Sequence, residues 1–163
     1  KFIKKSCLYC DSISFILPKS FKKDSMKKHF PINFHLIWER DMDKNSFIVD
    51  DIPHDVPCVF QIWEKRNEPR KVPEKLEPSY YKFVKKEENP DISFRRVGIN
   101  AGEIDKICDS KSTQSHYFIK FENDIDDEIL NKLKNISFVC KENTVAAKSI
   151  SKQELIKEFN MVI

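Results

Sequence analysis

The sequence predicts an α/β core over residues 1–66, followed by an α+β module over residues 67–163. The core is predicted by the segment 12–40, which alternates strand, polar loop, basic helix and strand. The next apolar run, 56–65, follows without an intervening helix, so we expect it to pair antiparallel with the strand before it. Prolines and charges dominate residues 67–78, and this composition marks the boundary between the two parts.

The core elements follow from apolar runs and helix signals. We expect the end of a helix at 1–10, a buried strand at 13–17, a basic helix at 19–29, and strands at 34–40, 46–49 and 56–65. The basic helix is capped near Asp24 or Ser25 and ends before Pro31. The run Ile13–Leu17 is typical of a parallel strand, which needs partners on both edges and helices on both faces. We expect it to lack one of these neighbours within the chain and to expose apolar surface there.

The second part alternates short strands with two helices. The predicted elements are strands at 80–84, 92–99, 103–108, 116–122 and 136–140, a helix at 126–134, and a helix at 152–160 capped by Ser151. Gly98 and Gly102 indicate a hairpin turn, which does not exclude a loop that approaches a DNA backbone.

Composition places the chain among globular proteins. Thirteen Phe in 163 residues supply a core, and 34% charged residues keep the exterior polar. No apolar run reaches the ~20 residues needed to span a membrane, and the odd number of cysteines is typical of a reducing compartment. We therefore expect an intracellular, cytoplasmic protein with no membrane partner. Cys7 and Cys10 have the spacing of half a zinc site without its second half, so we expect no metal.

Basic residues gather in separate clusters although the formal net charge is only +3. A basic face can neutralise the phosphates of nucleic acid, whereas the simpler interpretation of such runs is a solvated surface. The candidate nucleic-acid-binding residues are Lys22, Lys23, Lys27, Lys28, Arg95 and Arg96. Because Arg95 and Arg96 are adjacent on a predicted strand, we expect only one of them to face a groove or phosphate.

Pro18, Lys19 and Ser20 directly follow the first predicted strand. Ligands of open α/β sheets bind at the carboxyl ends of strands, so this loop is a candidate binding element. Its simpler interpretation is an ordinary connection between strand and helix.

Only two glycines occur in the chain, Gly98 and Gly102. Nucleotide-type cofactor sites need glycine where the backbone approaches the cofactor. We therefore expect no self-sufficient cofactor site, and the sequence is typical of the second half of a larger fold.

The order of several short motifs resembles the carboxyl-terminal half of amino-group DNA methyltransferases, with the N6-adenine class as the closest match. The motifs are Phe2-Ile-Lys-Lys-Ser6, Ile13-Ser-Phe-Ile-Leu-Pro-Lys-Ser-Phe21, Asn33-Phe-His-Leu-Ile-Trp38, Asn45-Ser-Phe47 and Val56-Pro-Cys-Val-Phe-Gln-Ile-Trp63. The resemblance implies that residues 1–66 are the terminal part of a Rossmann-like methyltransferase sheet. Residues 67–163 would be a small α+β appendage, a possible DNA-contacting module.

The resemblance also implies an activity, the S-adenosylmethionine-dependent methylation of adenine N6 in DNA. Pro18, Lys19 and Ser20 would shape the pocket of a base rotated out of the duplex. Phe47 would stack on that base, and its alternative role is core packing. The family's Asn-Pro-Pro-aromatic turn is missing, because Asn89-Pro-Asp-Ile92 lacks the second proline and the aromatic residue and is predicted to be a simple turn.

The cofactor-binding half of the family is also missing from these residues, so we expect no S-adenosylmethionine to bind this chain alone. A companion chain or an upstream segment would supply that half. The alternative is a non-enzymatic nucleic-acid-binding or protein-interaction module derived from the family. The four histidines have the spacing of neither a catalytic triad nor a metal site.

Overall fold

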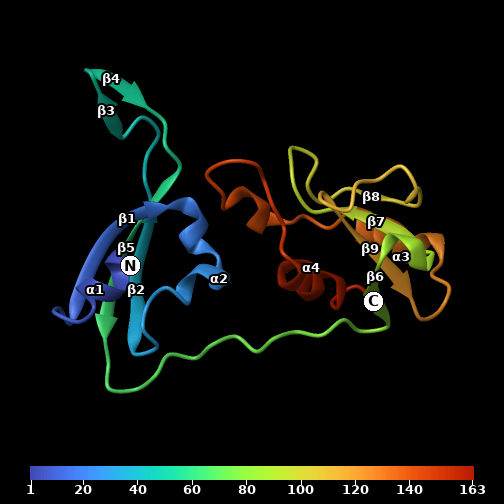
Figure 1. Cartoon of the computed structure of the whole chain (residues 1–163), viewed down its shortest axis with the longest axis horizontal. Helices are drawn as coiled ribbons and strands as arrows, with labels where there is room; N and C mark the ends of the chain where they lie inside the picture. Colours follow the sequence, from blue (N-terminus) through green and yellow to red (C-terminus); the bar gives the residue numbers. More distant parts are fainter. The chain divides into compact units, whose positions relative to one another are not determined.

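The computed structural model describes residues 1–163. The chain divides into two compact units, and Figure 1 colours their main parts, residues 1–73 and 74–163, from blue to green and from green to red. Unit 1 is Lys1–Pro73 with the short segment Asn143–Ala146, and unit 2 is Glu74–Glu142 with Ala147–Ile163. The main division therefore lies inside the proline-rich stretch 67–78.

Unit 1 is built on a three-stranded sheet in the order β1-β5-β2, formed by β1 (Ser12–Pro18), β5 (Cys58–Lys65) and β2 (Phe34–Asp41). β5 pairs antiparallel with both neighbours, so β1 and β2 run parallel to each other on either side of it. The predicted antiparallel pairing of 34–40 with 56–65 is confirmed. β1 is an edge strand whose partner within the chain is the antiparallel β5, so the parallel neighbour expected beside Ile13–Leu17 is not among these residues and the outer edge of β1 is unpaired.

The core of unit 1 lies on one face of this sheet. Alternate residues of β1 and β5 point into it, including the fully buried Trp63, whose ring stacks on Phe30 at 3.8 Å between centroids. Helix α1 (Phe2–Ser6) and the segment after β1 contribute Ile3, Cys7 and Phe21 to the same cluster. On the other face, Ile16 and Trp38 are about half exposed. We expected helices on both faces of β1, but within unit 1 no helix covers the face that bears Ile16 and Trp38.

The predicted basic helix 19–29 is two short turns. A 3₁₀ helix, η1 (Lys19–Lys22), and a single α-helical turn, α2 (Asp24–Lys27), are separated by Lys23, whose backbone is extended. The predicted N-cap near Asp24 or Ser25 is displaced to Lys23, which makes no side-chain cap. The break places Phe21 and Phe30 in the core together, with ring centroids 6.3 Å apart.

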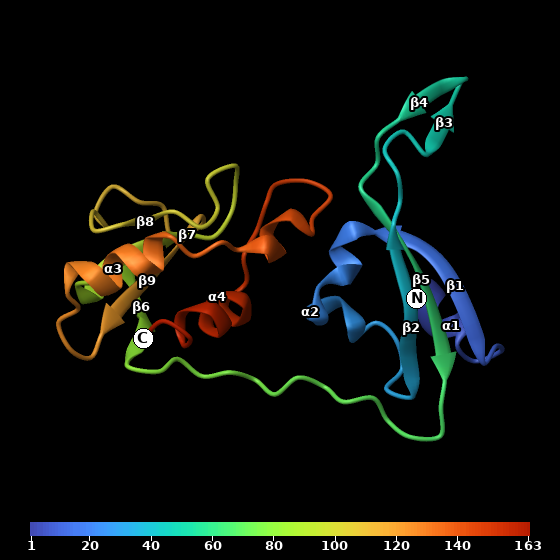
Figure 2. The same cartoon turned by 180° about the vertical axis from the view of Figure 1, so that it is seen from behind.

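A hairpin of β3 (Phe47–Val49) and β4 (Ile52–His54) connects β2 to β5 and extends beyond the sheet in both views (Figures 1 and 2). Its two-residue loop, Asp50–Asp51, has positive φ at both residues, as a type I′ turn requires. The extended piece at 46–49 was predicted, whereas β4 was not.

Unit 2 contains a four-stranded sheet in the order β6-β9-β7-β8, with antiparallel pairing throughout. Its strands are β6 (Tyr81–Val84), β9 (His116–Phe121), β7 (Ile92–Arg95) and β8 (Ile104–Asp105), and its α-helices are α3 (Asp127–Lys134) and α4 (Lys152–Phe159). Both helices begin as predicted. Asp126 caps α3, and Ser151 forms a capping box with Glu154 at α4.

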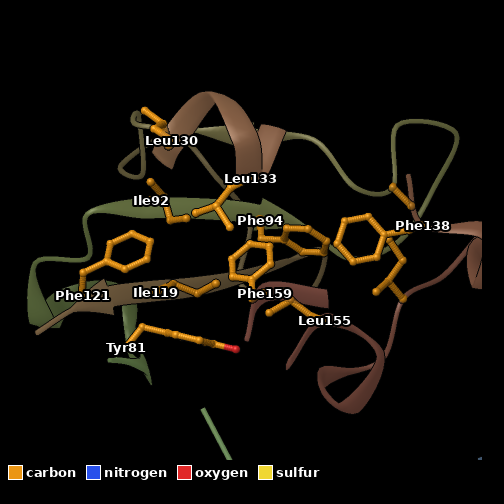
Figure 3. Packing of buried hydrophobic residues seen from close by; sticks show 12 residues of the cluster. Tyr81, Ile92, Phe94, Ile119, Phe121, Leu130, Leu133, Phe138, Leu155 and Phe159 are labelled. Atoms are coloured by element: carbon orange, nitrogen blue, oxygen red, sulfur yellow. The ribbon is translucent and has the colours of Figure 1, made fainter. Parts of the chain in front are cut away.

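The helices of unit 2 bury their apolar sides against one face of the sheet (Figure 3). Phe94 of β7 contacts the rings of Phe138 and Phe159, with centroids 5.3 and 5.9 Å away. Tyr81 is 2% exposed, and its hydroxyl has no hydrogen-bond partner. The opposite face of the sheet packs against the chain that follows β8, where the Ser93 hydroxyl donates to the carbonyl of Ile107 at 3.1 Å and lies 3.3 Å from that of Asp105.

Three predicted elements of unit 2 differ from the structure. The strands at 92–99 and 103–108 shorten to Ile92–Arg95 and Ile104–Asp105. The predicted strand 136–140 is wrong, because this segment has no strand partner and ends in a 3₁₀ helix, η3 (Val139–Glu142). Gly98 and Gly102 lie in the connection of β7 to β8 with φ of 102° and 106°, which confirms the predicted turn.

The whole chain thus has a mixed α/β fold with several antiparallel sheets and few helices. None of its helices has both the length and the apolar character needed to cross a bilayer.

Candidate functional site

The candidate site lies at one end of the sheet of unit 1. The register pairs Pro18 with Cys58 and Asp41 with Val59, so β1 and β2 end beside the first residues of β5. Two connections leave the sheet there: the Pro18–Ser20 loop after β1 and the β3–β4 hairpin after β2. The backbone N–H of Lys19 donates to the carbonyl of Pro57 at 3.0 Å, which fixes the loop against the chain entering β5.

Asp41 holds two of the predicted basic residues. Its carboxylate accepts a hydrogen bond from the Lys22 ammonium at 2.6 Å and lies 3.4 Å from the Lys19 ammonium. The hydrogen bond from Lys22, helped by the charge of Lys19, lowers the pKa of Asp41 below its usual range. The two lysines are therefore partly neutralised and held in place.

A buried polar side chain lies beneath this loop. Gln61 in the middle of β5 is fully buried, and its amide NH₂ donates to the Glu39 carboxylate at 2.9 Å. Its carbonyl oxygen accepts from the Trp63 indole N–H at 3.0 Å. The amide NH₂ also lies 3.3 Å from the carbonyl of Phe21 in η1, so Gln61 links the sheet to the loop above it.

The remaining predicted basic residues of unit 1 lie along α2. Lys27 pairs with Asp24 at 2.6 Å, and Lys28, directly after the helix, is exposed without an ion pair. Lys23 is half-buried at the break between η1 and α2. The predicted cluster is therefore divided, with Lys19 and Lys22 at the end of the sheet and Lys27 and Lys28 farther along the chain.

Phe47 begins β3, where it pairs with His54 and is half-buried. It belongs to neither hydrophobic core cluster. The neighbouring Ile48 and Val49 are 71% and 54% exposed. The hairpin thus presents an apolar surface that the core of unit 1 does not use.

Arg95 and Arg96 lie in unit 2. The Arg95 guanidinium donates to the carbonyl of Val97, and the Arg96 guanidinium donates to the carbonyl of Gln114 while it lies 5.5 Å from the centre of the Tyr117 ring. Arg95 lines a polar pocket with His116, whereas Arg96 contacts the ring of Tyr117. Burial lowers the pKa of His116, whose Nδ1 lies 3.2 Å from the carbonyl of Ser112.

Asp41, Gln61 and Arg70 were missed by the sequence interpretation. The Arg70 guanidinium donates to four main-chain carbonyls, those of Lys27, Phe30, Pro31 and Phe34. A glutamine inside the apolar run of β5 was a visible signal for Gln61. No local pattern identifies Asp41 or Arg70, because their partners are distant in the sequence.

The two glycines of the chain both lie in the β7–β8 connection of unit 2, where Gly98 faces the Arg95 side chain and Gly102 faces Phe138. No glycine therefore lies at the ends of β1 or β2.

Comparison with known protein families, curated proteins and solved structures found no match to this chain.

Proposed function

We propose that this chain is the base-facing part of an S-adenosylmethionine-dependent N6-adenine DNA methyltransferase, and that the cofactor site lies on a companion chain or an upstream segment. One observation carries the proposal: the Pro18–Ser20 loop and the Phe47 hairpin leave the same end of the sheet. β1 and β2 run in the same direction on either side of the antiparallel β5, and their carboxyl ends both lie at this end. Open α/β sheets bind ligands at the carboxyl ends of strands.

The arrangement suits a base that has been rotated out of a duplex. Pro18, Lys19 and Ser20 form one wall, and the Asp41 carboxylate fixes the Lys19 side chain there. Phe47 supplies a ring outside the core clusters, and stacking of a base on an aromatic ring contributes about 1–3 kcal/mol. These residues hold and orient the base, while the cofactor partner supplies the methyl group.

The sheet also supports a partner for unit 1. A Rossmann-like sheet is covered on both faces, and an antiparallel strand within an otherwise parallel sheet is common in such folds. β1 has an unpaired outer edge, and the face bearing Ile16 and Trp38 is open within unit 1. A companion chain or upstream segment that adds strands beside β1 would satisfy the backbone groups of that edge.

Methyl transfer by the complex that contains this chain tests the proposal. The complex isolated from its source would be incubated with DNA and S-adenosylmethionine, and the DNA digested and analysed for N6-methyladenine by mass spectrometry. We expect transfer, and we expect Phe47→Ala to slow it by about tenfold or more, from the lost stacking. Ile48→Ala, one residue along β3, is the matched control.

Absence of N6-methyladenine with the complete complex would contradict the proposal, as would equal rates for Phe47→Ala and its control. Calorimetry provides a separate check on the cofactor. We expect the chain alone to show no saturable binding of S-adenosylmethionine, and micromolar binding would place the cofactor on this chain.

The second candidate is a non-enzymatic interaction module, which the open apolar face of unit 1 favours. Ile16, Trp38 and Phe60 line a shallow hollow of about 300 Å³ on that face, together with Met42 and the charged residues Arg40, Asp41 and Asp43. Light scattering on the purified chain tests this role, because the open face and edge should cause self-association or capture of a companion chain. A stable monomer that binds no hydrophobic dye would show that the sheet needs no partner.

A further inference from the structure

We infer that a basic groove in unit 1, separate from the Pro18–Ser20 loop, binds the phosphodiester backbone of DNA. The groove has a volume of about 590 Å³ and lies between α1, α2 and the chain that follows β5. The inference rests on the proposed function, because it takes the DNA substrate of that function as its ligand.

Charge is the first argument. The groove is lined by five basic side chains and a single carboxylate, namely Lys4, Lys27, Lys28, Arg70, Lys71 and Asp24. The carboxylate is already paired with Lys27 at 2.6 Å. Lys4, Lys28 and Lys71 are exposed and form no ion pair, so three ammonium groups from three separate segments remain available to an anion.

Arg70 adds a fixed positive charge at the base of the groove. All of its terminal N–H hydrogen bonds go to main-chain carbonyls, and its guanidinium lies 5.8 Å from the centre of the buried Trp63 ring. Carbonyl dipoles satisfy the hydrogen-bond donors but leave the net charge uncompensated. Arg70 is therefore a positioning residue: its bonds to the carbonyls of Lys27 and Phe30 join the segment that bears Lys28 to the segment that bears Lys71, and its charge contributes to the positive potential of the groove.

The residue types that line the groove favour a phosphodiester strand over a free nucleotide. Sites for terminal phosphates use a cradle of backbone N–H groups with glycine, and unit 1 contains no glycine. Ile32 and Val72 line the groove and are 47% and 64% exposed, so they offer apolar contact to sugars between phosphates. Lysines spaced along a groove contact successive phosphates without reading the base sequence.

The groove lies away from the end of the sheet that carries the candidate base pocket. His35 and Leu36, which line it, are at the beginning of β2, whereas Asp41 is at its end. The groove would therefore add backbone contacts that position the DNA, and the Pro18–Ser20 loop would contact the base.

The test is fluorescence anisotropy of a labelled DNA duplex with the full chain over a range of salt concentrations. The groove variant is Lys28→Glu with Lys71→Glu. The control is Lys5→Glu with Lys157→Glu, which changes net charge equally at exposed residues outside the groove. Each lost phosphate contact lowers the slope of log affinity against log salt by about 0.9, so we expect a slope smaller by about 2 and an affinity lower by about tenfold for the groove variant alone.

Equal slopes and affinities for the groove and control variants would overturn the inference. So would displacement of the duplex by micromolar adenosine triphosphate from the wild type but not from the groove variant, because the groove would then hold a nucleotide. Tryptophan fluorescence during urea unfolding establishes that both variants are folded. The anisotropy assay does not depend on methyl transfer, so the two proposals can fail separately. A smaller salt slope for the groove variant, with no N6-methyladenine formed by the complete complex, would contradict only the proposed activity. N6-methyladenine formed by the complex, with an unchanged salt slope for the groove variant, would contradict only the proposed groove.

Discussion

Arg70 is predicted to be a main stabilising residue of unit 1. We expect Arg70→Met to lower the free energy of unfolding of this unit, because the substitution removes four hydrogen bonds to the carbonyls of Lys27, Phe30, Pro31 and Phe34 while keeping the apolar stem. The bonds join two segments that lie 36 to 43 residues apart in the sequence.

The structure sets the size of the effect. A hydrogen bond contributes about 0.5–1.5 kcal/mol net, and more when its donor is charged. Two of the carbonyls, those of Lys27 and Pro31, also accept backbone N–H groups, and the adjacent groove admits water. A value near 0.5–1 kcal/mol per bond therefore applies, which gives a loss of about 2–4 kcal/mol. Arg70→Lys should lose about half as much, since an ammonium cannot reach four carbonyls arranged around a planar guanidinium.

Urea unfolding followed by tryptophan fluorescence measures this loss in unit 1 alone, because Trp38 and Trp63, the two tryptophans of the chain, both belong to it. Arg66→Met is the matched control, since the Arg66 side chain is exposed. A loss below about 0.5 kcal/mol for Arg70→Met, or an equal loss for the control, would refute the reasoning.

Three further predictions concern single groups. His116, the only histidine of unit 2, is buried with a lowered pKa, so on acidification the unfolded chain binds a proton at this residue before the folded chain does. The stability of unit 2, measured by circular dichroism, should therefore fall as pH drops below about 6.5, and His116→Gln should remove this pH dependence. The pKa of Asp41 is lowered by its lysine partners, so its ionised carboxylate stabilises unit 1 above about pH 3.9, and this stabilisation is lost on acidification. Asp41→Asn should therefore make the unfolding midpoint, followed by tryptophan fluorescence, less dependent on acid pH. Tyr81→Phe should leave the thermal midpoint of unit 2 unchanged or raise it, because the buried hydroxyl that it removes has no partner; a loss above about 1 kcal/mol would reveal a missed hydrogen bond.

Local signals in the sequence were sufficient for elements whose causes are local. Helix α4 begins where Ser151 and Glu154 form a capping box three residues apart. The antiparallel pairing of β2 with β5 followed from a connection that contains no helix. The turn at Gly98 and Gly102 followed from the backbone freedom of glycine.

The errors occurred where distant contacts decide the structure. The alternation of Ile136, Phe138 and Cys140 imitates a strand, but these side chains pack on the core of unit 2 and no strand lies beside them. Packing of Phe21 and Phe30 against the sheet of unit 1 accompanies the break in the predicted helix 19–29.

Only part of the candidate site could be predicted from the sequence. The position of the Pro18–Ser20 loop at a strand end follows from the strand alone. The partners of its lysines do not, because Asp41 lies 19 residues after Lys22. β4 was missed because Pro53 weakens its strand signal and its turn contains two aspartates in place of the usual glycine.

The register of the β3–β4 hairpin depends on the length of the Asp50–Asp51 loop, although the loop is exposed. Two residues with positive φ set the pairing of Val49 with Ile52, and this pairing fixes the side of the ribbon on which Phe47 lies. Inserting or deleting one residue in the loop would shift the register and move every side chain of one strand to the opposite side. Replacement by Asn and Gly would preserve the turn and the orientation of Phe47. Homologues should therefore vary in the identity of these two loop residues far more readily than in their number.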